Sequence, residues 1–371
     1  MRTLHSIPCA PRAFLLNGGT LAELQEKYAI DLRRHSAYPN LVQLKYNQLA
    51  SPMNEELVQQ CRGLILDQDD NWSVVAWPFN KFWNYGETLA SEIDWSTATV
   101  QEKLDGSLMV LYFYDGGWRV ATSGMPDASG GVHGTNTTFV QLFWDTWHKQ
   151  GLKEPIAQRS YTFMFELTSP YNRVVVSHPQ STLTLTGIRN IWSGLELPIH
   201  YRGALNPAKT FELASFTGIE ETFEKMDPLA QEGYVVVDGS FNRVKVKHPG
   251  YVALHHMKSC FSVKRVVAVI QKGESSEVLT HFPEWTKPFE QVRAAYDGLV
   301  TQLEQDHAEL QDLKKDRKEF AMMAKQSVFP AVHFLMLDGH ATSVQDAMKH
   351  VHIDKMVEML GVRELVLEGA I

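Results

Sequence analysis

The segment from residue 96 to residue 122 constrains the fold of this chain more than any other. An apolar run at 108–114 and a second strand-like run at 118–122 flank Asp115-Gly116-Gly117. Asp-Gly between two such runs predicts a β-hairpin with a tight turn. Immediately before the hairpin stands Lys103-Leu104-Asp105-Gly106-Ser107. The hairpin therefore places a lysine, a carboxylate and a glycine on one loop or strand end, although a surface lysine beside a turn would give the same short pattern.

The other local signals predict a mixture of short helices and strands up to about residue 255. Thr20-Leu21-Ala22-Glu23 is a capping box that predicts a helix from Leu21 to about residue 29. Asn54 is a second candidate cap, for a helix that runs through Gln60. Further strands are expected at 41–46, 63–67, 72–77, 161–167, 173–177 and 183–188, and helices at 138–150 and 211–226.

Composition predicts a cytoplasmic globular protein. The 371 residues are enough for two domains with large apolar cores. No apolar run approaches the length needed to span a bilayer, and the first residues lack the apolar core of a signal peptide. Cys9, Cys61 and Cys260 are odd in number and far apart, which suits a reducing compartment and argues against a disulfide framework or a zinc site.

The net charge of −8 limits how the chain can bind nucleic acid. A general polyanion binder is usually basic overall, so a nucleic acid would have to meet a local positive groove. A candidate is the hairpin expected from 233–237 and 242–247 around Asp238-Gly239-Ser240. With the strand period of two, Arg243, Lys245 and Lys247 share one face. That face is either a solvated edge that discourages aggregation or a row of cations for phosphate oxygens.

Two glutamates stand in or beside apolar strands. Glu166 lies between aromatic and apolar residues in the strand expected at 161–167. A carboxylate there is costly to bury unpaired, so it needs either a salt bridge, such as one to Arg173, or a metal or ribose hydroxyl ligand. Glu232 precedes Gly233 at the start of the third hairpin, where a glycine allows close backbone approach and the glutamate can hold a cation.

Beyond residue 255 the strand signals fade and helical ones dominate. Residues 290–325 are dense in helix formers and contain Gly298 as their one glycine, which predicts a long helix. Four cations share this segment: Lys314, Lys315, Arg317 and Lys318. They form either an ordinary solvated helix face or a patch that contacts phosphate groups.

Taken in chain order, these motifs resemble the covalent nucleotidyltransferases, which include the ATP-dependent ligases and the capping enzymes. The four matching motifs are Lys103-Leu104-Asp105-Gly106, Phe165-Glu166, Glu232-Gly233 and Lys245-Val246-Lys247. Four further stretches, at 61–64, 81–87, 166–176 and 247–251, resemble the phage-type RNA ligase 1 family in particular. The resemblance covers roughly residues 40 to 255.

The resemblance implies an α+β fold with two domains. Residues 1–255 would form a nucleotidyltransferase (adenylation) domain of antiparallel sheets with flanking helices. Residues 256–371 would form an all-helical C-terminal domain that recognises the RNA substrate. DNA ligases and capping enzymes carry a β-barrel domain in that place, and the helical character of this C-terminal third argues against them.

The implied activity is ATP-dependent joining of 5′-phosphate and 3′-hydroxyl RNA ends through lysyl-AMP and RNA-adenylate, in RNA or tRNA repair. The implied cofactors are ATP and Mg²⁺, with Mn²⁺ as a substitute. The expected partner is RNA, as single-stranded ends or a nicked tRNA, and the protein is expected to be a monomer without membrane association. The alternatives are a non-catalytic RNA-binding module with the same fold, or a DNA ligase or capping enzyme.

The resemblance also assigns roles to residues. Lys103 is the implied nucleophile, which must be neutral to attack, and the positive charges of Lys245, Lys247 or a bound metal favour that form. The resemblance further implies that Arg62 and Lys81 orient the outer phosphates and that Lys245 and Lys247 contact the α-phosphate. It implies that Glu166 and Glu232 contact the ribose and the metal, and that Asp105 acts through metal-bound water. Gly106 would supply a tight turn, and Arg189 would border the adenine pocket. The chain departs from the family at Ser123-Gly124, because a basic residue is usual near that position.

Overall fold

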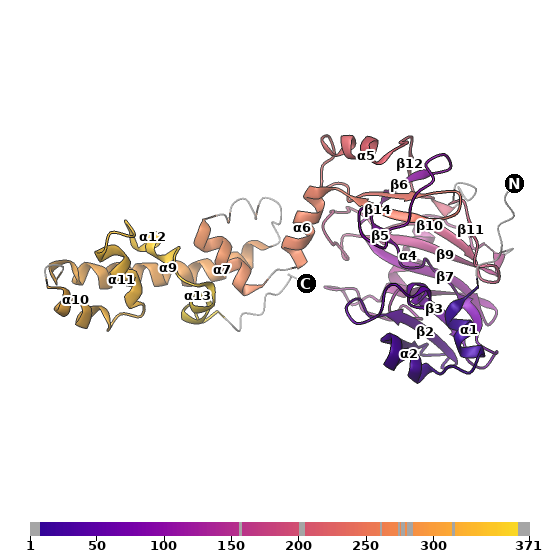
Figure 1. The fold of residues 1–371 in the computed structure, drawn as a ribbon, viewed down its shortest axis with the longest axis horizontal. Coiled ribbons are helices and arrows are strands. Elements are labelled where there is room, and N and C mark those ends of the chain that lie inside the picture. The colour runs from indigo at the N-terminus through magenta and orange to yellow at the C-terminus, as the bar shows by residue number, and fades with distance from the viewer. Residues whose placement is uncertain are drawn as a thin grey trace. The chain divides into compact units, whose positions relative to one another are not determined.

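The computed structural model describes residues 8–155, 158–199, 205–259, 262–273, 275, 279, 285–313 and 316–362. Contacts divide the chain into two compact units, Met1–Leu254 and His255–Ile371 (Figure 1). The first unit contains three sheets and the second is built from helices.

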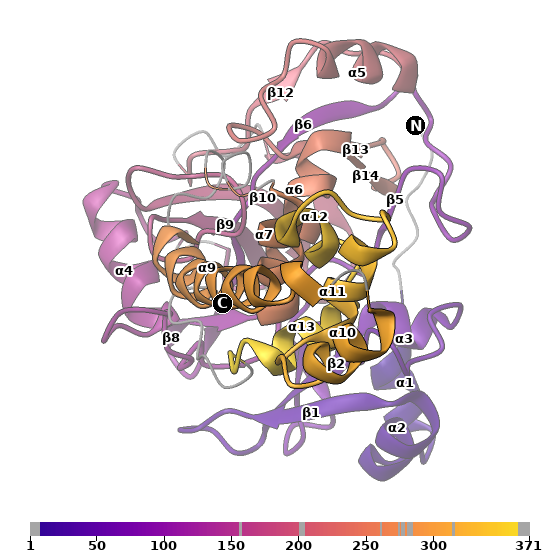
Figure 2. The same ribbon diagram turned by 90° about the vertical axis from the view of Figure 1, so that its left-hand side faces the viewer.

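The N-terminal sheet has the order β1-β2-β3-β4 and is antiparallel throughout. Its strands are β1 (Ile30–Arg34), β2 (Leu41–Tyr46), β3 (Arg62–Asp67) and β4 (Ser73–Ala76). Helices α1 (Ala10–Leu16), α2 (Leu21–Tyr28) and α3 (Glu56–Gln60) lie beside this sheet (Figure 2). Their apolar side chains form one core with those on one face of it. The capping box predicted at Thr20 and Glu23 is confirmed, whereas α3 has Glu55 and not Asn54 at its N-cap position.

The central sheet has the order β11-β10-β9-β7-β8. Its strands are β7 (Ser107–Tyr114), β8 (Gly117–Thr122), β9 (Tyr161–Thr168), β10 (Thr182–Asn190) and β11 (Glu196–Leu197). The predicted β7–β8 hairpin is confirmed, because Tyr114 pairs with Gly117 around a two-residue turn with positive φ at both positions. Helix α4 (Phe139–Lys149) packs Phe143 and Trp147 against Phe165 on one face of this sheet.

The third sheet carries Lys103 and is called the Lys103 sheet below. Its order is β12-β6-β13-β14-β5, with β5 (Trp83–Asn84), β6 (Thr99–Lys103), β12 (Thr210–Phe211), β13 (Gly233–Val237) and β14 (Arg243–Lys247). Helix α5 (Phe216–Phe223) packs against the apolar face formed by Val236, Val244 and Val246 (Figure 1). Because β14 lies between β13 and β5, its cations are not on a free sheet edge.

The strand predicted at 173–177 is wrong, because these residues form a loop between β9 and β10. The amides of Val175 and Val176 donate to Oδ2 of Asp105 at 2.7 and 2.6 Å, where a strand would donate to a neighbouring backbone. A side-chain carboxylate far away in sequence therefore replaces the backbone ladder that the β-branched residues predicted.

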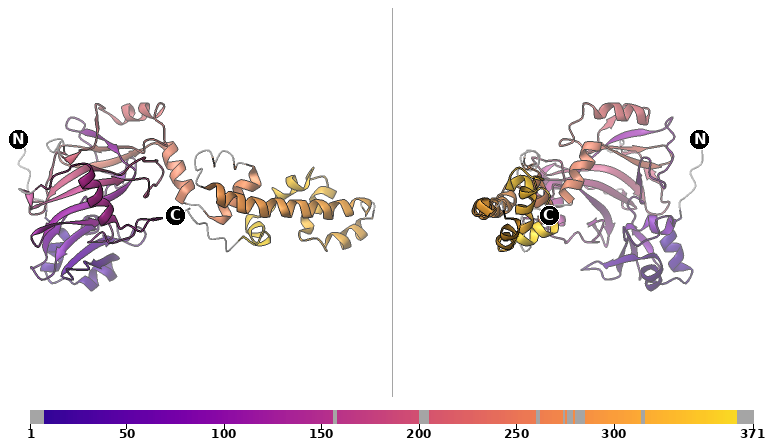
Figure 3. Two further views of the ribbon diagram at one scale, coloured as in Figure 1. Left: turned by 180° about the vertical axis from the view of Figure 1, so that it is seen from behind. Right: turned by 60° about the vertical axis from the view of Figure 1, so that its left-hand side comes forward.

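The second unit consists of helices in its described part, and α9 (Thr286–Glu309) is the longest (Figure 3). The others are α7 (Val263–Lys272), η4 (Gln311–Leu313), α10 (Arg317–Ala324), α11 (Pro330–Leu337), α12 (Val344–Met348) and α13 (Ile353–Met359), and α6 (Pro249–Ser259) spans the division between the units.

The single helix predicted over 290–325 is wrong. Helix α9 ends at Glu309. Asp316 then caps a new helix by accepting hydrogen bonds from the amides of Lys318 and Glu319. Arg317 and Lys318 therefore begin α10, while Lys314 and Lys315 lie outside the described residues.

Candidate active site

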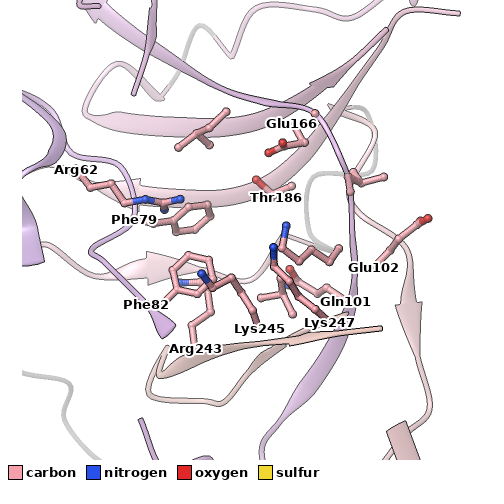
Figure 4. Close-up of a pocket in the computed structure, with 15 residues that line it drawn as sticks. Arg62, Phe79, Phe82, Gln101, Glu102, Glu166, Thr186, Arg243, Lys245 and Lys247 are labelled. Atoms are coloured by element: carbon pink, nitrogen blue, oxygen red, sulfur yellow. The ribbon is translucent and has the colours of Figure 1, made fainter. Parts of the chain in front are cut away.

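A cavity of about 280 Å³ lies between the central sheet and the Lys103 sheet. Figure 4 shows Glu166 and Thr186 on one side of it, Arg243, Lys245 and Lys247 on the other, and Arg62 entering from β3. Its lining residues are Arg62, Phe79, Phe82, Gln101, Glu102, Lys103, Leu104, Gly106, Leu108, Glu166, Thr186, Val235, Arg243, Lys245 and Lys247. We call this cavity the Lys103 pocket.

Strand register brings Lys103, Glu232 and Lys247 together. Gly233 pairs with Lys103 on β6 and with Lys247 on β14, so the residue before it lies between the two lysines. The Glu232 carboxylate contacts Lys103 Nζ at 2.6 Å and Lys247 Nζ at 2.9 Å, and the Glu232 side chain is only 3% exposed. Gly233 has a φ of +141°, and a Cβ there would collide with the carbonyl oxygen of Val246. Only glycine fits this close approach.

The face of β14 that the sequence predicted to be cationic lines the pocket. Arg243, Lys245 and Lys247 all contribute to the lining, while Val244 and Val246 point into the core beneath α5. Burial, together with the charges of Lys81 and Lys103, lowers the pKa of Lys245 to about 8. The pocket thus concentrates positive charge that is only partly balanced by carboxylates, which suits a phosphorylated ligand.

Glu166 lines the pocket from the central sheet. It makes no hydrogen bond or salt bridge to the described part of the chain, and the Nε of Arg173 instead donates to the carbonyl of Val175 at 2.8 Å. Burial raises the pKa of Glu166 to about 7, although Lys103 and Arg62 act in the opposite direction. A half-buried carboxylate without a hydrogen-bond partner in the described chain favours a ligand role over the structural salt bridge considered from the sequence.

Arg62 and Lys81 differ in their relation to the pocket. Arg62 lines it, with its guanidinium carbon 5.1 Å from the ring centre of Phe82, and burial lowers the pKa of its guanidinium. Its Nη1 is buried without a partner in the described chain. Lys81 lies outside the lining, where its Nζ contacts Oε1 of Gln48 at 3.3 Å and stands over the rings of Tyr46 and Trp83.

Asp105 holds a loop and does not line the pocket. Besides the two amides that bind its Oδ2, its Oδ1 accepts from the hydroxyl of Tyr251 at 2.9 Å, and the residue is 4% exposed. Within the described ranges, no three His, Cys, Asp or Glu side chains group closely enough to hold a metal ion. The geometry therefore gives Asp105 a structural task. It leaves Glu166, which lines the pocket, and Glu232, which contacts the lining residues Lys103 and Lys247, as the candidate ligand carboxylates.

The structure differs from the expectations of a tight turn at Gly106 and of an adenine-pocket border at Arg189. Gly106 has an ordinary φ, and its need for glycine comes from β9, because a Cβ at this position would collide with the carbonyl oxygen of Leu167. Arg189 does not line the pocket. Its guanidinium binds Glu196 at 2.9 Å, the carbonyl of Pro78 at 2.7 Å and Oδ1 of Asn80 at 2.8 Å.

The sequence did not predict the aromatic residues that line the pocket or the buried carboxylate that holds Arg243 in place. Phe79 and Phe82 line the cavity, and the guanidinium of Arg243 lies 4.3 Å from the ring centre of Phe79. Arg243 is held by Glu196, whose Oε1 and Oε2 accept at 3.2 and 2.8 Å. The cationic face of β14 was a signal for Arg243, but nothing local to the sequence linked it to Glu196 on another sheet.

Comparison with known proteins decides the family. A family model described as RNA ligase matches residues 60–251, which include every residue assigned above to the Lys103 pocket. The chain belongs to this RNA ligase family. The resemblance to phage-type RNA ligases that the sequence motifs indicated is therefore confirmed.

Individual relatives of this RNA ligase agree with the family match. The chain is 26% identical to an RNA ligase of Rhodothermus phage RM378, over 80% of this chain and 85% of the relative. It is 28% identical to a putative bifunctional polynucleotide kinase/RNA ligase of Autographa californica nuclear polyhedrosis virus, over 77% of this chain but only 44% of that longer protein.

Solved structures give weaker similarity. An archaeal ATP-dependent RNA ligase is 15% identical with a TM-score of 0.48, over 78% of this chain and 83% of its own. A mutant Naegleria gruberi RNA ligase with ATP and Mn is 15% identical with a TM-score of 0.33, over 43% and 52% of the two chains. Among the described helices of this RNA ligase, none is long and apolar enough to cross a membrane.

Proposed function

We propose that this RNA ligase is ATP-dependent and joins a 5′-phosphate end to a 3′-hydroxyl end through lysyl-AMP and RNA-adenylate. The observation that carries the proposal is the position of Lys103. Its amine opens into a pocket lined by Arg62, Lys245 and Lys247 and lies 2.6 Å from the carboxylate of Glu232. A nucleophile held among phosphate-binding cations is what attack on a nucleoside triphosphate needs.

The first step forms a bond between Nζ of Lys103 and the α-phosphorus of ATP and breaks the bond to the β-phosphate, which releases pyrophosphate. The attacking amine must first lose a proton, and Glu232 is the acceptor in contact with it. Lys245 and Lys247 face the developing charge on the α-phosphate, and Arg62 is placed to hold the outer phosphates so that pyrophosphate leaves in line.

The second step moves AMP from Lys103 to an oxygen of the RNA 5′-phosphate and frees the amine. In the third step an RNA 3′-hydroxyl attacks that phosphate, and AMP leaves. All three steps exchange one phosphoryl bond for another, so positioning and charge neutralisation by the pocket cations provide the catalysis.

Glu166 and Glu232 are the residues that would hold Mg²⁺ or Mn²⁺ against the phosphates of bound ATP. The half-buried carboxylate of Glu166 lines the pocket without a hydrogen-bond partner in the described chain. It fits this task, because Mg²⁺ commonly binds through one or two carboxylates together with substrate phosphates. When bound, the ion neutralises phosphate charge. Glu166 is equally suited to accept from a ribose hydroxyl.

The wider setting of the reaction is also part of the proposal. The proposed substrates are RNA ends, including those of a nicked tRNA. The protein would act as a monomer and repair these ends in the cytoplasm. The widely spaced cysteines support a reducing compartment. The second unit would recognise the RNA, while residues up to 255 form the adenylation domain.

The test is covalent labelling with α-³²P-ATP followed by a denaturing gel. The wild-type protein should retain label, and Lys103→Ala should retain none while still sealing RNA that is already adenylated. Lys149→Ala, which changes an exposed lysine on α4, is the matched control. A protein that binds RNA but never retains label would be the non-catalytic binding module, and label on Lys103→Ala would remove this lysine from the mechanism.

A further inference from the structure

Lys45 is a half-buried cation that nothing in the described chain neutralises. It lies on β2, and its ammonium makes no hydrogen bond, ion pair or ring contact with the described residues. A cation whose side chain is half-buried and has no partner in the described chain has its donors available for an anionic ligand.

A β-bulge turns Arg62 to the same face of the N-terminal sheet as Lys45. Leu44 pairs with Leu64, but Lys45 pairs with Arg62, so Gly63 is an extra residue on β3. Gly63 has a φ of +89°, which glycine adopts without strain. Directly paired residues point to one face and successive residues alternate, so the bulge pairs Arg62 with Lys45 and not with Tyr46. The long guanidinium of Arg62 still reaches the Tyr46 hydroxyl.

The turn after β8 receives the side chain of Lys45. A Cβ on Gly124 would lie 3.1 Å from Nζ of Lys45, so the absence of a side chain there leaves room for the amine. Gln43 holds this turn against β2 by donating its Nε2 to the carbonyl of Thr122 at 2.8 Å. Thr122 pairs with Met109 at the end of β7 that follows the Lys103 segment.

We infer that Lys45 binds a phosphate group other than the one that Lys103 attacks. The inference rests on the proposed function and adds a residue to its phosphate-binding set. Lys45 and Arg62 present two cations on one face, and Arg62 lines the pocket with a buried Nη1 that has no partner in the described chain. Two cations on directly paired residues, each with a free donor, match two phosphate groups of one ligand.

Such phosphates have two sources in this reaction. They are either the outer phosphates of ATP or the backbone phosphates of the RNA end. The chemistry that recognises them is the same, and the reaction steps separate the sources. Lysyl-AMP formation uses the phosphates of ATP only. Sealing of RNA that is already adenylated uses the RNA phosphates and the AMP phosphate, and none of the outer phosphates of ATP.

The experiment compares Lys45→Ala, Lys45→Arg and the control Lys149→Ala in both steps, with circular dichroism as a check on folding. Lys45→Ala should slow one of the two steps about 10- to 100-fold, because removal of a charge-assisted hydrogen bond has that effect. Slower lysyl-AMP formation with a raised KM for ATP assigns the phosphate to ATP. Slower sealing with a weaker salt dependence assigns it to RNA. Lys45→Arg should recover most of the activity.

A second variant tests the geometry. Gly124→Ala would place a Cβ 3.1 Å from Nζ of Lys45, so the amine has to shift by a few tenths of an ångström. The variant should slow the same step, yet add nothing to the loss of activity in a Lys45→Ala background. Wild-type rates of both steps in folded Lys45→Ala, an equal loss of activity in Lys45→Arg, or fully additive effects in the double variant would each overturn the inference. Failure of the wild-type protein to form lysyl-AMP would instead overturn the proposed function.

Discussion

The amine of Lys103 lies 2.6 Å from the carboxylate of Glu232, although the two residues are 129 positions apart in the chain. Their contact follows from the register of β6 with β13, in which Lys103 pairs with Gly233. The same glutamate also contacts Lys247 at 2.9 Å. A single carboxylate therefore sets the positions of the proposed nucleophile and of one proposed phosphate-binding lysine.

Glu232→Gln should separate this positioning role from a role in folding. The amide keeps the shape of the side chain but removes the charge that holds both lysines, so lysyl-AMP formation should fall about 100-fold while the circular dichroism spectrum is retained. Lys103 and Lys247 are 19% and 25% exposed, so water can solvate them after the change.

The matched control for that variant is Glu221→Gln, which changes an exposed glutamate on α5. It should leave labelling unchanged. If Glu232→Gln unfolds at the assay temperature, the glutamate is needed for structural pairing, and its proposed catalytic role loses its support.

Glu166 should give the protein a pH dependence near neutrality. Burial raises its pKa to about 7 from 4.5. The ionised form is the one that can bind a metal or accept from a ribose hydroxyl, so lysyl-AMP formation should rise as the pH rises through about 7. Glu166→Gln should lower the rate and remove that rise.

The same shift affects stability in the opposite sense. Between pH 4.5 and about 7 the unfolded chain has lost the Glu166 proton while the folded chain keeps it, so the free energy of unfolding falls as the pH rises. Thermal unfolding of the nucleotide-free protein at pH 5 and pH 8 measures this fall. It should be smaller in Glu166→Gln, and an equal fall in both proteins would contradict the assigned pKa.

Glu196 holds Arg243, which lines the Lys103 pocket. It binds Arg189 at 2.9 Å and Arg243 at 2.8 Å, and all three side chains are at least 93% buried. Glu196→Gln would leave two buried guanidinium groups without a full counter-charge, and breaking such a pair typically costs about 3–5 kcal/mol. The melting temperature should fall, and the KM for ATP should rise because Arg243 lies over Phe79. An unchanged KM in protein that is still folded would limit Glu196 to a structural role.

The sequence predicted the parts of the site that depend on local pattern. Strand alternation placed Arg243, Lys245 and Lys247 on one face, and the pocket uses all three. The turn chemistry of Asp115-Gly116 predicted the hairpin that follows the Lys103 segment. These features depend on neighbours a few residues apart, so they are visible without the fold.

The features that the sequence did not reveal depend on distant partners. The β-branched run at 174–176 predicted a strand, but the carboxylate of Asp105 binds its amides. The triad of Arg189, Glu196 and Arg243 joins two sheets. The helix predicted over 290–325 is interrupted where Asp316 caps α10, and helix propensity alone did not locate that break.

The second unit should recognise RNA and should not be needed for adenylation. A protein that ends after Ser259 keeps the whole of α6, including Tyr251, which binds Asp105. It should still form lysyl-AMP, because every residue that lines the Lys103 pocket precedes that end. Joining of a structured RNA should fall more than joining of short single strands, since folded RNA is recognised mainly by its shape and backbone. Absence of labelling in the folded, shortened protein would contradict this division of tasks.

The basic segment that includes Arg317 and Lys318 tests how the second unit binds RNA. Both residues are exposed at the start of α10, and Arg317 contacts Asp338 at 2.9 Å, a surface pair that a phosphate can displace at little cost. A variant with Lys314→Gln, Lys315→Gln, Arg317→Gln and Lys318→Gln should bind structured RNA more weakly. The slope of log K against log salt should become shallower by about 0.7–0.9 for each RNA phosphate that the variant no longer neutralises. The control is Lys264→Gln with Lys349→Gln, which removes exposed cations in α7 and directly after α12 of the same unit. An unchanged slope in the four-residue variant would identify this segment as an ordinary solvated surface, and another face of the second unit would have to bind the RNA.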